Sequence, residues 1–206
     1  MTQANNAEEY ISDLRKKLAL NPECGTTHYN LAVALIGLKQ YEEAEKELYQ
    51  ALENSPSIAE AYVQLGGIAL QRNDMEKCIY YNKMSVRARA GFSPGYGNLG
   101  FLYLQSGDVD EAITNLKKAI AFNSMFIQAY ANLANAYLIK GLVDESIEAS
   151  LKALKIEPLF AVSHNNLAIA YLEKEDYKKA AEHCDKAIQC GYEVAPEILK
   201  EINNNR

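Results

Sequence analysis

The side chains that could bind a metal ion are few and scattered. The sequence contains four cysteines (Cys24, Cys78, Cys184 and Cys190) and three histidines (His28, His164 and His183). Zinc sites need clustered pairs of such residues, and no C-x-x-C spacing occurs. We therefore expect no metal site and no cofactor. Cys78 and Cys184 are predicted to be small core residues, and the histidines are predicted at helix positions without an obvious partner.

The other patterns with chemical meaning also point away from catalysis. Gly95-Tyr-Gly97-Asn-Leu-Gly100 matches the G-x-G-x-x-G fingerprint of dinucleotide binding, but that fingerprint has meaning only between a strand and a helix, and here it lies inside a predicted helix. Neighbouring acids such as Glu42-Glu43 are typical of the first turn of a helix, where they interact favourably with the helix dipole. No nucleophile or acid–base constellation is apparent. The sequence predicts a protein that is not an enzyme.

Composition narrows the class of partner. The 206 residues include 27 acidic and 21 basic side chains, a formal charge of −6. A nucleic-acid binder would carry a basic surface, so nucleic acid is not an expected partner. The longest apolar stretch, residues 31–38, is far shorter than the roughly 20 residues that span a bilayer. The polar, acidic start does not resemble a signal peptide. We expect a cytoplasmic protein without membrane contact.

A repeat of 34 residues organises the chain. Asn-Leu or Gln-Leu recurs at this step, beginning at Asn30, Gln64, Asn98, Asn132 and Asn166. Small residues follow each leucine at fixed distances, for example Ala32, Ala44 and Ala51 in the first repeat. A ring precedes each leucine by three residues, in the series His28, Tyr62, Tyr96, Tyr130 and His164. Small residues let two helices approach closely, and the larger side chains fill the space between them.

Each repeat is predicted to be a helix, a short turn and an antiparallel helix. Turn sequences such as Ser106-Gly107-Asp108 divide the repeats, and Pro56 and Pro158 lie where a helix must end. One such pair cannot bury its apolar face alone, so the pairs are expected to stack into a right-handed all-α solenoid. The expected division is a cap at 7–24, repeats at 25–58, 59–92, 93–126, 127–160 and 161–194, and a capping helix at 195–206.

The ends and the second repeat carry more specific expectations. Tyr10, Leu14 and Leu18 are predicted to form the packing face of the first cap. Ile198, Leu199 and Ile202 are predicted to cover the last helix pair. The second repeat places Asn82 where an apolar residue is usual and ends without a proline, so we expect a local irregularity there.

These registers resemble the tetratricopeptide repeat (TPR) family, over nearly the whole chain. The family's usual tryptophan is replaced by Tyr or His. The segment from Pro158 to Ala168 is similar to the TPR superhelix of O-GlcNAc transferase, but too few residues lie outside the repeats for its catalytic domain. The resemblance implies that positions 2, 5, 6, 9, 12 and 13 of each repeat, counted from Gly25, and the last two positions face a groove that binds a partner.

A row of carboxamides is the main candidate within this groove. Position 6 is Asn30, Gln64, Asn98, Asn132 or Asn166 in the five repeats. A carboxamide offers both donors and an acceptor, so a regular row could hydrogen-bond the backbone of an extended peptide. The alternative is that these side chains only hold adjacent helices together. The further candidates for peptide binding are Tyr29, Phe101, Asn135, Asn165, Phe126 and Phe160. The alternative for the two last phenylalanines is packing between neighbouring repeats.

The remaining groove positions define the expected ligand. Glu60, Glu173 and Glu193 are the charged residues among them, and none is Lys or Arg. Ligands with a free carboxylate or a phosphate are therefore disfavoured, because both need basic clusters. We predict a non-catalytic adaptor or assembly factor that binds an uncharged or mildly basic peptide segment, with space for it at Gly67, Gly97 and Ala131. The alternative is a self-assembling homo-oligomeric scaffold, in which the last helix of one copy occupies the groove of the next. The second repeat also carries a basic group that is expected to be solvated, with a secondary contact to an acidic partner as the alternative; its members are Arg72, Lys77, Lys83, Arg87 and Arg89.

Overall fold

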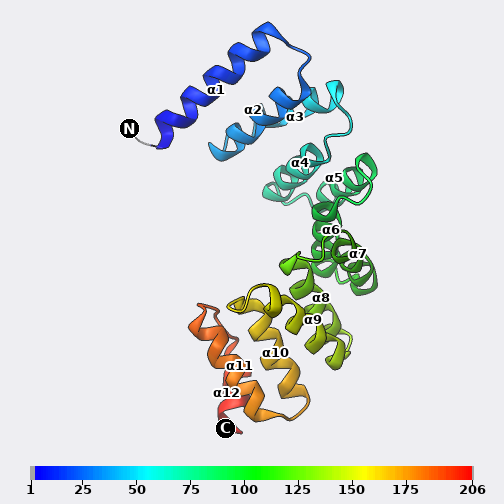
Figure 1. Ribbon diagram of the computed structural model, residues 1–206, viewed down its shortest axis with the longest axis vertical. Helices are drawn as coiled ribbons and strands as arrows, with labels where there is room; N and C mark the ends of the chain where they lie inside the picture. The colour runs from blue at the N-terminus through cyan, green and yellow to red at the C-terminus, as the bar shows by residue number, and fades with distance from the viewer. Residues whose placement is uncertain (1–2, 206) are drawn as a thin grey trace. The chain divides into compact units, whose positions relative to one another are not determined.

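The computed structural model describes residues 3–205, and every regular element in that range is an α-helix. The helices are α1 (Gln3–Leu20), α2 (Gly25–Gly37), α3 (Tyr41–Asn54), α4 (Ala59–Gln71), α5 (Met75–Ala88), α6 (Ser93–Gln105), α7 (Val109–Phe122), α8 (Ile127–Ile139), α9 (Val143–Ile156), α10 (Ala161–Glu173), α11 (Tyr177–Gln189) and α12 (Pro196–Asn204) (Figure 1). The predicted fold class, an all-α solenoid of helix pairs, is confirmed. Among the described residues, none of the helices has the length and apolar character that a membrane span requires.

The helices begin at the spacing that the sequence predicts. The first helices of the repeats start at residues 25, 59, 93, 127 and 161, and the second helices at 41, 75, 109, 143 and 177. Each step is therefore 34 residues in both series. Outside the repeats, α1 is longer than expected, because it begins at Gln3, and α12 begins at Pro196. Proline suits this position, since the first turn of a helix needs no backbone N–H donor.

A left-handed residue ends the turn after each first helix. The residues are Lys39, Asn73, Gly107, Gly141 and Glu175, with φ between 58° and 82°. The next N–H then bonds back into the helix, as when Gln40 donates to the carbonyl of Leu35 at 2.9 Å. Glycine adopts this backbone conformation freely, whereas side chains with a Cβ are strained in it. Two of the five turns thus carry lysine or glutamate at a cost.

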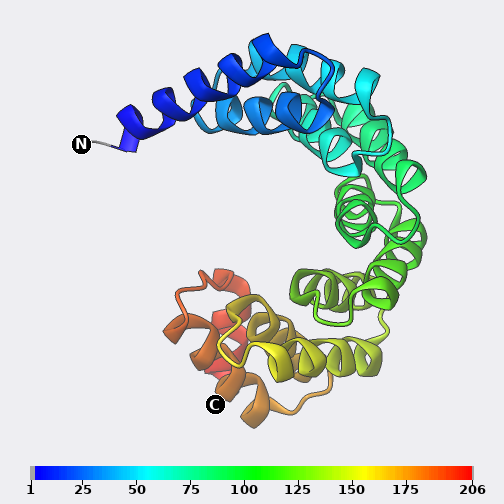
Figure 2. The ribbon, with the colours of Figure 1, turned by 45° about the horizontal axis from the view of Figure 1, so that its top comes forward.

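The chain divides into two compact units, residues 1–95 and 96–206, with the boundary inside α6. In the N-terminal unit, α2 packs on α1 and α3, and α4 packs on α3 and α5; Figures 1 and 2 show α1 and α2 side by side. Ile11 and Leu14 are the buried residues of α1, and Leu18 packs beside them. The prediction for Tyr10 was wrong, because this side chain is 49% exposed. The buried face follows residues 11, 14 and 18, which lie on one side of the helix.

In the C-terminal unit, α8 packs on α7 and α9, α10 packs on α8, α9 and α11, and α12 packs on α11. Ile202 of α12 is almost fully buried, and Ile198 and Leu199 contact the same cluster. All three residues that were expected to cover the last helix pair thus contact its apolar cluster. Cys184 and, in the other unit, Cys78 are buried as expected.

Small residues set the distance between paired helices. A Cβ added at Gly100 would lie 2.4 Å from Cγ of Leu116, so only glycine allows α6 and α7 to pack at this distance. In the second repeat, Asn82 takes part in the packing of the paired helices. Its side chain is buried and donates from Nδ2 to the carbonyl of Cys78 at 2.9 Å. The expected irregularity does not interrupt the helix, since α5 is continuous. The departure lies in the following turn, where Gly91 has φ 76°.

Candidate peptide-binding site

On the first helices of the N-terminal unit, α2 and α4, Glu60 is the one charged side chain. Tyr29 of α2 is half-buried, and its hydroxyl is hydrogen-bonded to the side chain of Gln64 on α4. Burial raises the pKa of Tyr29 above its ordinary value. Asn30 is half-buried, and Val33, one turn further along α2, is 39% exposed. Among residues 3–205, no group of the chain hydrogen-bonds the carboxamide of Asn30.

On the first helices of the C-terminal unit, α6, α8 and α10, the charged side chain is Glu173. Phe101 of α6 is 42% exposed, and Asn135 of α8 is also exposed. Asn132 lies one turn before Asn135 and is half-buried. Neither carboxamide on α8 forms a hydrogen bond within the described part of the chain. The two side chains therefore keep donors and acceptors that a ligand can use.

Other members of the carboxamide row are engaged within the protein. Asn166 is 4% exposed and donates from Nδ2 to the carbonyl of Ala131 on α8 at 3.0 Å. Asn165 is also buried, at 8% exposure, and Asn98 is half-buried with an interaction inside the chain. For Asn166, the alternative interpretation therefore holds, since its side chain links two neighbouring helices. The available carboxamides are Asn30, Asn132 and Asn135.

The phenylalanines at the ends of repeats are not both exposed to a ligand. Phe126 is half-buried, and its ring lies 2.6 Å from the point that a Cβ at Gly97 would occupy. Gly97 was predicted to leave space for a ligand, but Phe126 fills that space. Phe160 is half-buried at the N-cap of α10. In the N-terminal unit Gly67 is open, with no atom near its Cβ position.

Acidic and basic side chains near these surfaces are partly neutralised. Glu60, at position 2 of its repeat, pairs with Arg89 at 2.6 Å. Arg72 pairs with Glu45 at 2.8 Å, so two of the basic residues noted in the second repeat have acidic partners in the chain. Glu173 is exposed, at the end of α10.

The histidines have partners, contrary to the prediction. His28 places Nδ1 2.6 Å from Glu47 Oε2 and Nε2 2.8 Å from the carbonyl of Pro22. His164 places Nδ1 3.0 Å from Nδ1 of His183 and Nε2 3.0 Å from the carbonyl of Pro158. Each partner lies 19 residues after its histidine. The equal spacing was visible in the sequence, but without the helix-pair geometry nothing marked it as a contact.

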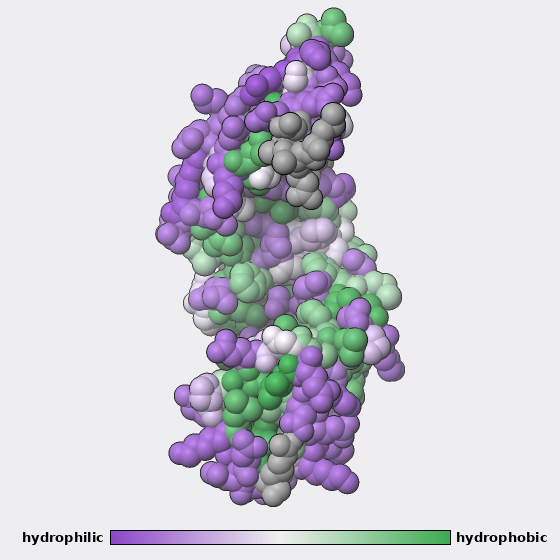
Figure 3. Space-filling view, turned by 90° about the vertical axis from the view of Figure 1, so that its left-hand side faces the viewer, coloured by the Kyte–Doolittle hydropathy of each residue, from purple (hydrophilic) through white to green (hydrophobic). Residues whose placement is uncertain are grey.

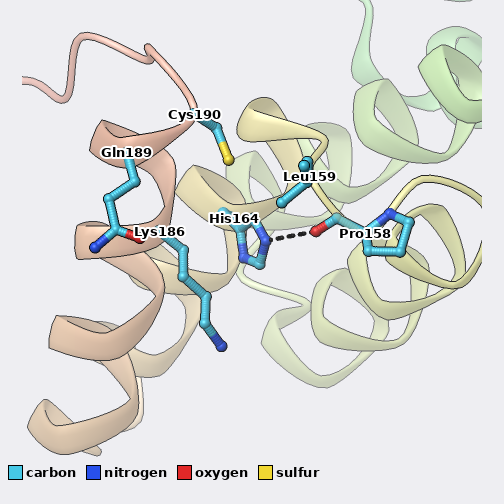
Figure 4. A pocket seen from close by; sticks show the side chains of 6 residues that line it. All are labelled: Pro158, Leu159, His164, Lys186, Gln189 and Cys190. Carbon is cyan, nitrogen blue, oxygen red and sulfur yellow. Dashed lines mark hydrogen bonds between the residues drawn. The ribbon is translucent and has the colours of Figure 1, made fainter.

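A pocket that sequence reasoning missed lies beside His164. It has a volume of about 540 Å³, and its walls come from the turn before α10 and the last turns of α11. Figure 4 shows His164 bonded to the carbonyl of Pro158, with the thiol of Cys190 on the same side as Leu159 and the Gln189 side chain directed away. Three or more potential metal-ligating side chains do not gather at any point within residues 3–205.

Helix pairs at constant spacing, with first helices that carry few charges, define a class of helical repeat proteins. Models of TPR repeats match residues 3–57, 29–91, 100–141, 127–158 and 161–190. The chain belongs to the tetratricopeptide repeat family, and the predicted membership is confirmed. It is accordingly a protein–protein interaction module. No curated protein is significantly similar to it in sequence.

Solved structures share the fold. The chain is similar to PilF of Pseudomonas aeruginosa, with 18% identity, a TM-score of 0.82 and coverage of 99% of this chain and 92% of that one. It is also similar to YrrB, described as a TPR protein with an unusual peptide-binding site, with 22% identity, a TM-score of 0.72 and coverage of 93% and 96%. MamA from Desulfovibrio magneticus RS-1 follows with 22% identity, a TM-score of 0.69 and coverage of 81% and 94%.

Proposed function

We propose that the protein is a non-catalytic adaptor or assembly factor that binds an extended, mostly uncharged peptide segment of a partner along its first helices. The observation that carries this proposal is the pair of available carboxamides on α8, Asn132 and Asn135. The N-terminal unit separately offers the available carboxamide of Asn30 with the exposed Val33 one turn further along α2, and Phe101 of α6 is an exposed apolar side chain of the C-terminal unit.

The chemistry of a carboxamide suits a peptide backbone. One amide side chain offers two N–H donors and a carbonyl acceptor, so it pairs with both polar groups of a main-chain unit. Each such bond contributes about 1 kcal/mol net. Asn132 and Asn135 lie one turn apart on α8, so together they can bond two polar groups of the same peptide. Because these contacts read the main chain, specificity must come from apolar contacts such as those of Phe101.

Charge supports a segment without acidic groups. The first-helix positions listed above carry no Lys or Arg, and Arg89, which lies near them, is paired with Glu60. A terminal carboxylate or a phosphate would lose its hydration without finding a cation. The peptide-binding site named for the similar structure YrrB supports peptide binding on this fold.

The proposal is tested with a displayed library of peptides. The best binder is made as a labelled peptide, and its Kd is measured by fluorescence polarisation. The double variant Asn132→Ala/Asn135→Ala should weaken binding at least tenfold and leave the melting temperature nearly unchanged, because neither carboxamide is bonded within the described chain.

The matched control removes two carboxamides from second helices. Gln50 bonds Glu53 on α3, and Asn115 bonds the carbonyl of Glu111 on α7. Gln50→Ala/Asn115→Ala should bind like the wild type. Equal affinity of all three proteins would refute peptide binding through α8. Light scattering across concentration tests the alternative: a mass that rises with concentration would favour the self-assembling scaffold.

A further inference from the structure

A pocket with an acidic rim lies at the C-terminal end of the predicted binding surface. It has a volume of about 250 Å³ and lies between α10, the start of α11 and α12. Ile169 and Ile198 belong to its apolar walls, and Glu173, Glu175 and Glu201 supply carboxylates. In Figure 3, the lower part of the molecule, which holds α10 and α11, shows a hydrophobic patch with hydrophilic side chains around it.

The pocket continues the surface that carries the available carboxamides. Ile169 follows Asn135 by one repeat, and Glu173 follows Ile139 by one repeat. Asn135 and Ile139 are both exposed on α8, and α8 packs directly against α10 in the same unit. A peptide bonded to Asn132 and Asn135 can therefore extend to the mouth of the pocket.

The three carboxylates lack cationic partners. No lysine or arginine is among the pocket's lining residues, and none of the three glutamates forms an ion pair within residues 3–205. Glu60, the acidic residue at position 2 in the N-terminal unit, differs because Arg89 neutralises it. Among the charged groove positions named above, Glu60 is therefore neutralised by an ion pair of the described chain, whereas Glu173 is not.

The apolar walls of the pocket favour a long basic side chain over a small cation as its occupant. Ile198 is half-buried against the cluster of α10, α11 and α12, and Ile169 is half-buried on α10. Lysine and arginine have long aliphatic stems that pack on apolar surface while the charged head stays among polar groups. A pocket with aliphatic walls and a carboxylate rim matches both parts of such a side chain.

We propose that this pocket receives a lysine or arginine side chain of the bound peptide, and that it thereby sets the position of the peptide along the protein. This inference rests on the proposed function, because the basic residue belongs to the same extended segment.

The test uses acetylated, amidated peptide libraries that are uncharged except at one fixed residue. The fixed residue is lysine, arginine, glutamine, norleucine or glutamate, and affinity is measured by fluorescence polarisation. Wild-type protein should bind the lysine and arginine libraries at least fivefold more tightly than the norleucine library. Glu173→Gln/Glu201→Gln should reduce this preference to less than twofold while binding of the norleucine library stays unchanged. Higher salt should reduce the preference as well.

The control removes the same charge elsewhere. Glu76 of α5 and Glu197 of α12 are exposed and do not line the pocket, so Glu76→Gln/Glu197→Gln should keep the preference. Equal binding of the lysine and norleucine libraries by the wild type would overturn the inference and leave the proposed function standing. Absence of binding by every library would overturn both.

Discussion

The first and fifth repeats contain the same histidine in the same backbone setting, with different partners. In both, Nε2 of the ring faces the carbonyl of a proline six residues earlier, Pro22 or Pro158. In both, Nδ1 faces a side chain of the second helix, which is the carboxylate of Glu47 in one repeat and the ring of His183 in the other. The fold is therefore the same, and one residue decides the chemistry of the contact.

A carboxylate and an imidazole differ in the hydrogen bonds that they can form with Nδ1 of the histidine. A carbonyl and a carboxylate only accept hydrogen bonds, so His28 satisfies both when it is doubly protonated. His164 can donate from Nε2 to the carbonyl of Pro158, and its Nδ1 lies 3.0 Å from Nδ1 of His183, so one of these two Nδ1 atoms donates and the other accepts. Burial, followed by His164, lowers the pKa of His183 to about 4. The comparison teaches that an imidazole in place of the carboxylate puts at this position a ring whose protonation is opposed by burial.

The largest expected effect concerns the asparagines at position 6 of the same two repeats. Asn166→Ala removes a buried bond to Ala131 and should lower the free energy of unfolding by about 1–2 kcal/mol. Asn30→Ala removes a half-exposed side chain without a bonded partner in the described chain and should change it by less than about 0.5 kcal/mol. Urea unfolding measures both. Equal losses would mean that the two asparagines have the same role.

A second, smaller effect is acid sensitivity of the fifth repeat. Between about pH 6.5 and pH 4, His183 is protonated in the unfolded chain but stays unprotonated in the folded protein. The free energy of unfolding should therefore fall as pH falls. The loss should be on the order of 1 kcal/mol, since the ring is partly exposed to solvent. His183→Gln should flatten this part of the profile, and Glu47→His should introduce a similar slope in the first repeat. A profile unchanged by His183→Gln would contradict the assignment.

The smallest effect concerns the turns, where the two repeats are alike. Lys39 and Glu175 have φ of 59° and 58°, so Lys39→Gly and Glu175→Gly should each stabilise the protein by about 0.5 kcal/mol. Lys174 precedes Glu175 with φ −90°, and Lys174→Gly should destabilise it instead. Thermal melts give the sign of each change, and a loss for both turn variants would show that the side chains stabilise the turns.

Periodicity was sufficient to predict the helix starts, because packing of paired helices forces small residues and leucines to recur at fixed positions. Contacts between repeats were harder to predict. The burial of Asn166 and the filling of the Gly97 site by Phe126 depend on the offset between neighbouring helices. The spacing of residues within one repeat does not predict that offset. The prediction for Tyr10 failed because α1 is a single helix outside the five repeats. The pattern of small residues that marks the packing face of a helix pair is therefore missing in it.

The most direct test of peptide binding along the first helices is an NMR titration of the side-chain NH₂ groups with the peptide selected from the library. The resonances of Asn132 and Asn135 should shift on saturation, while those of Asn115, bonded within α7, should stay in place. Unshifted Asn132 and Asn135 resonances at full occupancy would contradict the account.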